Sequence, residues 1–447
     1  MKTTKSQNHY SLLFFRAALT VTVPFGVEHA NAQSVRVDTQ LLQQLQDTIQ
    51  QQQVQLHKQA ETLDALQRQI DDLKQATGEI QNQAAQTVST AQQAVDSSRH
   101  VDTPSAIFTS GGEHLKLSIS GQLNRAVNFV NDGKSTETYF VDHTTSGSRV
   151  NFVASARMSE DLMLGSRIEI AIAPDNSAII SQSTPTPGDS FNQRWTEISL
   201  ASNQYGKLSL GKGDTASNTT AEADLSGTLS VQNSSVADIV YNMSFRERAG
   251  DHALTTIKVS NAFSNQDGLN RESRFRYDTP RFYGFSLAAS SVSNRRADAA
   301  VFWDGQGYGF NAAARAAVSN PNIAQAGKRY DGSFSILHSN TGLNLTLSAG
   351  SQEHDNQIND TNLYGKLGWL AKLNSFGNTA FIMEYTRAEN TPSAHDVGYE
   401  VGAGIDQFFD KYDTELYLQY RRFSLNRNSG PAVQDIFAGT LGARVRF

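Results

Sequence analysis

Basic side chains recur at alternate positions in several segments of the carboxyl-terminal half of this sequence. One residue separates Arg274 from Arg276, and one residue separates Arg444 from Arg446. Because a strand places alternate residues on the same face, both members of each pair would project to one side. A guanidinium group does not deprotonate in proteins, and it presents forked donors to carboxylate or phosphate oxygens. This pattern predicts weak, reversible binding of small anions.

A larger set of charged residues is expected on the inner face of the predicted strands, if the apolar residues of each strand, at the alternate positions, face outward. Its acidic members are Glu169, Glu384, Glu400 and Glu415. A ladder of cations would lower the barrier to the passage of anions, and many weak sites would let the anions leave again. The alternative is that arginines chiefly pair with the glutamates and stiffen the wall. The predicted basic members are Arg157, Arg167, Arg246, Lys258, Arg274, Arg276, Arg315, Lys366, Arg421, Arg444 and Arg446.

Motifs for other chemistry are missing from the sequence. It has no G-x-S-x-G, H-E-x-x-H or EF-hand pattern, and its ten histidines are scattered. Gly305–Gly309 is typical of a turn, and Glu353–Asp355 is typical of solvated surface. We therefore expect no enzyme, no metal and no cofactor, although a hydrolase built from single residues on separate strands stays open.

The overall composition narrows the class of protein further. The 447 residues carry a formal net charge of -6, which argues against nucleic acid as a partner. No cysteine is present, so disulfide frameworks and thiolate metal sites are excluded. No apolar run approaches the roughly 20 residues that a spanning helix needs. A membrane crossing would therefore depend on strands.

The last stretch, Asp435–Phe447, has the pattern of a membrane-spanning strand. From Phe437 onward every second residue can face hydrocarbon, whereas the residues between them are small or charged. A half-buried strand of a soluble sandwich is the alternative. The aromatic end at Phe447 resembles the closing strand of bacterial outer-membrane barrels, where the assembly machinery reads such a tail.

The same alternation runs through the chain from Leu115 onward. Arg149–Met158 and Leu162–Ile172 are two such segments, and only three residues join them. Short turns alternate with long polar loops, as in up-and-down membrane barrels. We predict an all-β transmembrane antiparallel barrel over residues 115–447, with about 16 strands, or 18 as the alternative. The predicted short turns are 203–206, 280–284 and 339–342, and the predicted long loops are 174–193, 218–235, 320–328, 351–360 and 426–434.

The amino-terminal part has a different character. Residues 1–32 combine basic residues, an apolar stretch and the small-x-small ending Ala30–Ala32, which predicts a signal peptide; a retained amphipathic helix is the alternative. From Leu42 to Ala94, apolar residues recur at spacings of three and four, which predicts an α-helical coiled coil over residues 33–96. A disordered Gln-rich tract is the alternative. One helix alone cannot bury so narrow an apolar stripe, so the predicted coil needs a second copy of the chain. Residues 97–114 would form the linker.

Two segments resemble the Gram-negative general porins. Ser273–Leu287 has a tyrosine, an acidic residue and a proline before an aromatic-glycine turn, and Tyr205–Lys212 is similar to the hairpin that precedes the inward-folding third loop. With the predicted coil and the Phe447 ending, the mature chain resembles the DcaP-like outer-membrane porins. That resemblance implies a homotrimer of mostly sixteen-stranded barrels, a periplasmic coil, and a preference for small anionic solutes such as dicarboxylates.

The segment Gly213–Asp238 lies where porins fold a loop into the lumen. It contains four carboxylates, and acids that faced an arginine wall would create a transverse field at a constriction. An exposed surface loop is the alternative. The predicted constriction residues are Asp214, Glu222, Asp224 and Asp238.

Together these features predict a trimeric porin of the bacterial outer membrane that passes small hydrophilic solutes and prefers anions. Its expected partners are membrane lipid, the assembly machinery, further copies of itself through the coil, and small anionic solutes. A phosphate-type anion porin and a structural or adhesive envelope tether stay open as alternatives.

Overall fold

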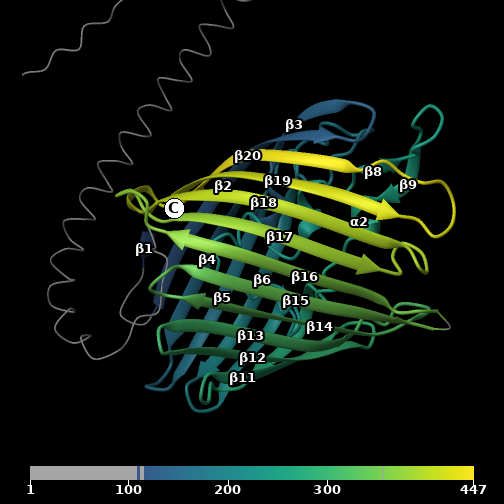
Figure 1. Cartoon of the computed structure of the whole chain (residues 1–447). Helices are drawn as coiled ribbons and strands as arrows, with labels where there is room; N and C mark the ends of the chain where they lie inside the picture. Colours follow the sequence, from purple (N-terminus) through teal and green to yellow (C-terminus); the bar gives the residue numbers. More distant parts are fainter. Residues whose placement is uncertain (1–107, 111–114, 356) are drawn as a thin grey trace, which may run out of the picture. The chain divides into compact units, whose positions relative to one another are not determined.

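The computed structural model describes residues 108–110, 115–355 and 357–447. The predicted signal peptide and coiled coil lie outside these residues. The described part is a closed antiparallel barrel, shown in Figure 1. Eighteen strand segments form one sheet, but β3 and β4 share one position, because both pair with β2, and β1 only extends an edge. The barrel therefore has 16 strands, the first of the two predicted numbers.

Strand bounds define the wall and its connections. Between the strands of the described chain lie the short helices η2 (Thr144–Ser146), η3 (Val236–Ile239), α2 (Val259–Ala262) and η4 (Asp410–Tyr412). The strands are β1 (Phe108–Ser110), β2 (Leu115–Asn131), β3 (Thr136–Asp142), β4 (Arg149–Arg157), β5 (Leu162–Ile172), β6 (Phe191–Ser202), β7 (Gly206–Asp214), β8 (Ser244–Arg246), β9 (Leu254–Lys258), β10 (Arg271–Asp278), β11 (Phe285–Val292), β12 (Arg296–Gly307), β13 (Phe310–Asn320), β14 (Ala326–His338), β15 (Leu343–His354), β16 (Asp360–Ala371), β17 (Thr379–Glu389), β18 (Val397–Phe409), β19 (Thr414–Asn426) and β20 (Ile436–Arg446).

Alternation along each strand separates a lipid-compatible face from an inner face. On β20, Leu441 is 55% exposed and Val445 is 43% exposed, whereas Ala438 and Thr440 are fully buried. Exposed apolar side chains continue around the barrel, for example Leu367 and Met383. An outward apolar band of this kind is what a bilayer requires of a barrel. The faces predicted for the last strand are therefore confirmed.

The barrel closes where its last strand meets its first. Residues 437–446 of β20 pair with residues 122–131 of β2. Beyond that ladder, Phe447 exchanges two backbone hydrogen bonds with Gly121, at 2.6 and 3.0 Å. β1 then pairs with residues 117–119 of β2, so part of the predicted linker joins the sheet.

Several predicted connections differ from the observed ones. The turns near 203–206, 280–284 and 339–342 are short, as predicted. The loops predicted at 320–328 and 351–360 are shorter than expected, because β14 begins at Ala326 and β15 extends to His354. The loop predicted at 218–235 is much longer, since no wall strand occurs between β7 and β10. This long segment, residues 215–270, is called the inserted loop below.

Candidate functional site: an arginine-lined constriction

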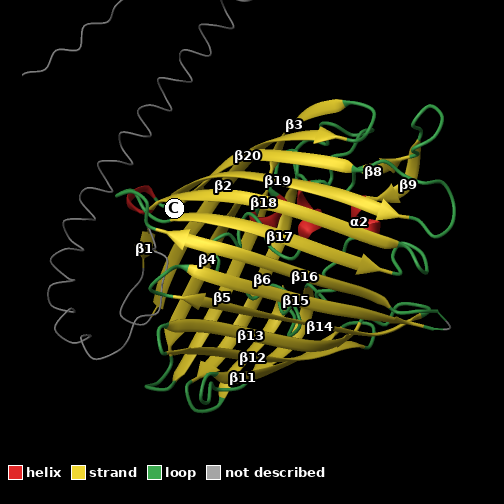
Figure 2. Cartoon of the chain, in the orientation of Figure 1, coloured by secondary structure: helices red, strands yellow, loops and turns green. Residues whose placement is uncertain are grey.

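The inserted loop folds into the barrel. Its apolar residues Val236, Ile239 and Val240 are buried, and they belong to one cluster with the inward-facing Tyr417 and Phe423 of β19. Figure 2 shows the short helices of this loop within the ring of strands. Because the loop buries its apolar side against the wall, it narrows the lumen and leaves its polar side toward the remaining space.

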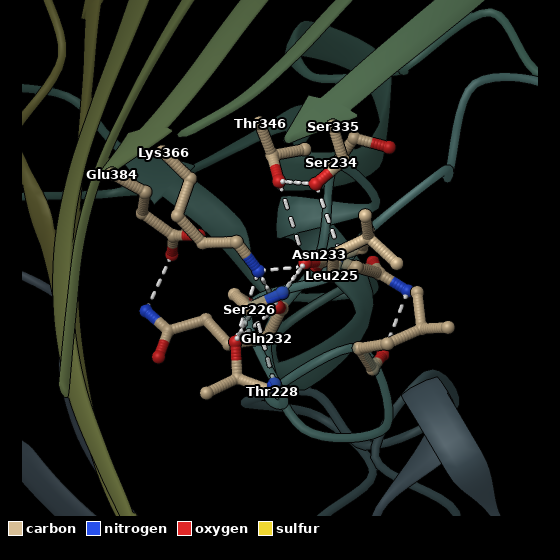
Figure 3. A network of polar contacts seen from close by, with 12 residues as sticks. Leu225, Ser226, Thr228, Gln232, Asn233, Ser234, Ser335, Thr346, Lys366 and Glu384 are labelled. Carbon is tan, nitrogen blue, oxygen red and sulfur yellow. Dashed lines mark hydrogen bonds and ion pairs between the residues drawn. The ribbon is translucent and has the colours of Figure 1, made fainter. Parts of the chain in front are cut away.

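Buried ion pairs and hydrogen bonds hold the loop on the β16–β19 side of the wall. Figure 3 shows Lys366 and Glu384 of the wall with Gln232 of the loop. Lys366 of β16 pairs with Asp224 of the loop and donates to the carbonyl oxygen of Gln232 at 2.8 Å. The Gln232 amide donates to Glu384 of β17 at 2.5 Å, and Arg421 of β19 donates to the same carboxylate at 2.7 Å. Gln232, Lys366, Glu384 and Arg421 are buried, so they fix the loop from the wall side, whereas Asp224 also reaches the cavity on the other side of the loop.

A cavity of about 560 Å³ lies between the polar side of the loop and the opposite wall. The loop contributes Glu222, Asp224 and Leu229, among others. The wall contributes two further carboxylates, Glu169 and Asp304, and Asp214 lies at the end of β7. The arginines that line the cavity are Arg149, Arg167, Arg194, Arg271, Arg315 and Arg444.

A β-bulge brings two of these arginines together. Glu169 pairs with Trp195 and the next residue of β5 pairs with Gln193, so Arg194 is the extra residue of β6. A bulge changes the direction of nearby side chains, and here both Arg194 and Trp195 reach the cavity. Arg167 lies 3.9 Å from the centre of the Trp195 ring. Arg167 and Arg194 both donate to Glu169 at 2.5 Å, which positions them as a pair.

Carboxylates also orient two other cavity arginines. The guanidinium group of Arg271 lies 3.0 Å from Asp214, and that of Arg315 lies 2.6 Å from Asp304. These side chains are only partly buried, so the ion pairs hold the arginines in place with their remaining donors still accessible. The arrangement can attract a small anion and let it pass.

Burial raises the pKa values of two acids of the inserted loop, Asp238 and Glu222. Burial, reinforced by the nearby Glu222 carboxylate and opposed by Arg421, raises the pKa of Asp238 to about 7. Burial also raises the pKa of Glu222, although a hydrogen bond from Ser235 at 3.0 Å acts in the opposite direction. Glu222 lies between the arginine cavity and a smaller one of about 320 Å³, which Asp238 lines. Near neutral pH the loop therefore carries reduced negative charge.

The cavity brings together part of the predicted set. The structure places these side chains around one space, although they come from distant parts of the chain. The predicted residues that line it are Arg167, Arg315, Arg444, Asp214, Glu222 and Asp224.

Other predicted residues lie away from the cavity. Arg274 is buried in an ion pair with Glu197 at 2.6 Å, and Arg276 pairs with Asp278 and donates to the carbonyl oxygen of Thr215 at 2.6 Å. Both arginines thus support the wall and the start of the inserted loop. Parity gives the face of the strand, but it does not show whether a neighbouring carboxylate or a folded loop covers the side chain.

The remaining predicted basic residues also lie away from the cavity, because alternation along a strand does not show what covers a side chain or where the strand ends. Lys366 and Arg421 lie beneath the inserted loop, as described above. Arg157 is exposed at the end of β4, and the Arg446 side chain, 44% exposed, lies near the end of β20. Arg246 and Lys258 belong to the hairpin β8–β9 of the inserted loop, so their assignment to wall strands was wrong.

Three cavity arginines were missing from the predicted set. Arg149 has the same parity as Arg157 on β4, so the alternation could have identified it. Arg194 directly follows the loop predicted at 174–193, and the bulge at this residue leaves no signal in the hydrophobic pattern. Arg271 is the first residue of β10, where alternation has only begun.

Two further features bear on the class of protein. Among the residues that the structure describes, no helix has the length and apolar character that a membrane crossing needs. Within the same residues, no group of three or more histidine, cysteine, aspartate or glutamate side chains is arranged to hold a metal ion.

Comparison with known proteins gives a consistent result. The sequence profile of the Gram-negative porin family matches residues 83–439. No curated protein matches the sequence significantly. Among solved structures, the anion-selective porin of Comamonas acidovorans is similar, with 15% identity, a TM-score of 0.51, and coverage of 74% of this chain and 100% of that one.

The outer membrane channel DcaP of Acinetobacter baumannii is also similar, with 12% identity and a TM-score of 0.50 over 76% of this chain and 99% of that one. At this identity the likeness shows a shared fold. The family profile covers most of the chain, including the inserted loop and nearly all the wall strands. The chain therefore belongs to the Gram-negative porin family and is a porin of the outer membrane.

Proposed function

We propose that this porin passes small hydrophilic solutes by diffusion and prefers anions. The observation that carries the proposal is the cavity in which six arginines face the inserted loop. Fixed cations in a narrow, partly desolvated passage attract anions more strongly than the same charges would in water. Many weak sites, instead of one tight site, keep conduction fast.

The balance of charge among the residues that line the cavity favours anions over cations. Five carboxylates line the same space, but Asp224 is already paired with Lys366 behind the loop. Burial also raises the pKa of Glu222. The arginines therefore exceed the acids that can neutralise them, which supports anion preference in spite of the net charge of -6 of the whole chain.

Small dicarboxylates are the solutes that we propose. The resemblance to DcaP-like porins implies this class, and a cavity of about 560 Å³ has room for such molecules. The Comamonas porin with a similar fold is anion-selective, which is consistent with the proposal. A phosphate-type anion porin would use the same arginines, so solute competition has to separate the two.

We further propose that three copies assemble, with residues Leu42–Ala94 as a periplasmic coiled coil. The lipid-facing band would contact outer-membrane lipid, and Phe447 would be the tail that the assembly machinery reads. In the alternative function, a structural tether, the coil would be the active part. Deleting residues 33–96 should leave conductance intact if solute diffusion through the barrel is the main function, whereas loss of envelope attachment with no channel activity would favour the tether.

Reconstitution in a planar bilayer tests the proposal directly. A tenfold KCl gradient should give a reversal potential of the sign that indicates chloride permeation. A cation-selective potential, or no conductance from correctly folded protein, would contradict anion preference.

A further inference from the structure

A break in one barrel strand creates a niche at the edge of the arginine cavity. β3 ends at Asp142 and β4 begins at Arg149, and both pair with the continuous strand β2. Between them the chain leaves the ladder and forms the short helix η2. The niche consists of Thr145 and Ser146 from this break, Arg149 of β4 and Arg444 of β20, all of which line the cavity.

More hydrogen-bond donors point at the hydroxyl oxygen of Ser146 than this oxygen has lone pairs to accept from. Gln122 donates to its oxygen at 2.9 Å, Arg149 at 3.0 Å and Arg444 at 3.2 Å. A hydroxyl oxygen has two acceptor lone pairs, so three donors cannot all make full hydrogen bonds to it. A further acceptor in the niche would relieve this deficit.

The niche also holds the least neutralised charge of the cavity. Among the described residues, Arg149 has no carboxylate within ion-pair distance, whereas Arg167, Arg194 and Arg315 each have one. The Arg444 side chain is 7% exposed and pairs with Glu415 through one nitrogen. Its Nε has no hydrogen-bond partner in the part of the chain that the structure describes. Two guanidinium groups thus meet at one neutral hydroxyl.

Surrounding hydrogen bonds keep this arrangement rigid. Gln122 and Asn124 of β2 donate to the carbonyl oxygen of Ser146 at 2.5 and 3.1 Å. The Asp142 carboxylate accepts from the backbone N–H of Ser148 at 3.0 Å. A ligand would therefore bind to donors that are already oriented, which reduces the ordering cost of binding.

We propose that this niche is an oxyanion-binding subsite, in which Arg149 and Arg444 hold one carboxylate or phosphate group of a passing solute. The inference rests on the proposed anion preference and adds a specific stopping point to it. Planar guanidinium groups match the paired oxygens of carboxylates and phosphates, whereas a spherical chloride ion cannot use both donors of a fork equally well. Oxyanions should therefore be retained in the niche while chloride passes.

Competition with the chloride current tests the subsite. The full-length porin is reconstituted in KCl, and succinate or inorganic phosphate is added in separate experiments. Wild-type current should fall in a saturable way with one or both anions, and the effective anion identifies the oxyanion class. Arg149→Lys keeps the charge but loses the forked donors, so the reversal potential should persist while the apparent dissociation constant for the block rises about tenfold.

Arg422→Lys is the matched control, because this exposed arginine of β19 has a carboxylate partner, Asp435, at 2.6 Å and does not line the cavity. It should change the block constant by less than about twofold. Equal block of wild type and Arg149→Lys, or equal weakening in both variants, would overturn the subsite. An anion-selective wild type without oxyanion block would overturn the subsite alone, whereas a wild type without anion preference would overturn the proposed function.

Discussion

Asp238 is the loop carboxylate whose ionisation should change within the physiological range of pH. Its pKa is raised to about 7 by burial and by Glu222, with Arg421 opposing. Above pH 7 it is negatively charged and reduces the attraction of anions by the cavity arginines. Below pH 7 it is protonated and neutral, so anion preference should increase as pH falls from 8 to 6.

The variant Asp238→Asn isolates this carboxylate from Glu222, which also titrates at a raised pH. Reversal potentials of the variant should stay close to the acidic value of the wild type across the same range. If the variant titrates as steeply as the wild type, Asp238 does not control the selectivity.

Arg274 is expected to matter for stability more than for selectivity. Its side chain is 2% exposed and that of its partner Glu197 is 5% exposed. Arg274→Ala would leave the buried carboxylate with only the more distant, partly exposed Lys207, at 3.8 Å, as a cation, which costs up to about 3–5 kcal/mol of unfolding free energy. Denaturant unfolding in detergent measures the loss. The double variant Arg274→Ala/Glu197→Ala should be more stable than the single one, and a double variant that is less stable would contradict the ion-pair argument.

At the level of elements, alternation alone identified most of the wall. The bounds of β5, Leu162–Ile172, agree with the predicted segment. The break at η2 and the bulge at Arg194 were not predicted, because each depends on how a strand meets its neighbours. A period of two identifies a strand, but it does not identify the sheet that the strand joins.

The hairpin β8–β9 shows this limit clearly, because its alternating residues belong to the inserted loop and not to the wall. Outside its short ladder, Glu247 forms an isolated antiparallel bridge with Val433, in the loop after β19. Arg248 donates its backbone N–H to Ala432 at 2.7 Å, and Arg246 pairs with Asp132 at 2.6 Å. Figure 1 shows this hairpin at the end of the barrel opposite to the carboxyl terminus. The inserted loop is therefore anchored both at the constriction and at the outer rim.

A cysteine pair tests the outer anchor. The chain has no cysteine, so Glu247→Cys/Val433→Cys introduces the only two thiols. Bridged residues of antiparallel segments have Cα atoms about 4.5–5.5 Å apart, which suits a disulfide. Oxidation should shift the mobility of the unfolded protein on a non-reducing gel. The control Glu247→Cys/Ala432→Cys should cross-link poorly, because Ala432 projects to the other side; equal cross-linking would show that the hairpin is not held in this register.

For the whole molecule, the sequence predicted a closed barrel but not the way in which the seam is completed. Pairing of β20 with β2 uses residues whose alternation is visible, whereas the contact of Phe447 with Gly121 depends on the exact stagger of the two strands. Arginines from β4, β6 and β20 meet in one cavity only because this stagger closes the ring. Closure is therefore a condition for the site as well as for the fold.

Gly121 is the residue at which closure can be tested. A Cβ atom there would lie 2.6 Å from the Phe447 ring and 2.7 Å from the carbonyl oxygen of Arg149, which is backbone and cannot move aside cheaply. Gly121→Val should cost at least about 1–3 kcal/mol and reduce the fraction of heat-modifiable, folded barrel on a gel. Gly439→Val on β20 is the matched control, because a Cβ atom there meets nothing within 4 Å. If both variants assemble equally well, the terminal aromatic ring does not complete the seam in the way that the structure implies.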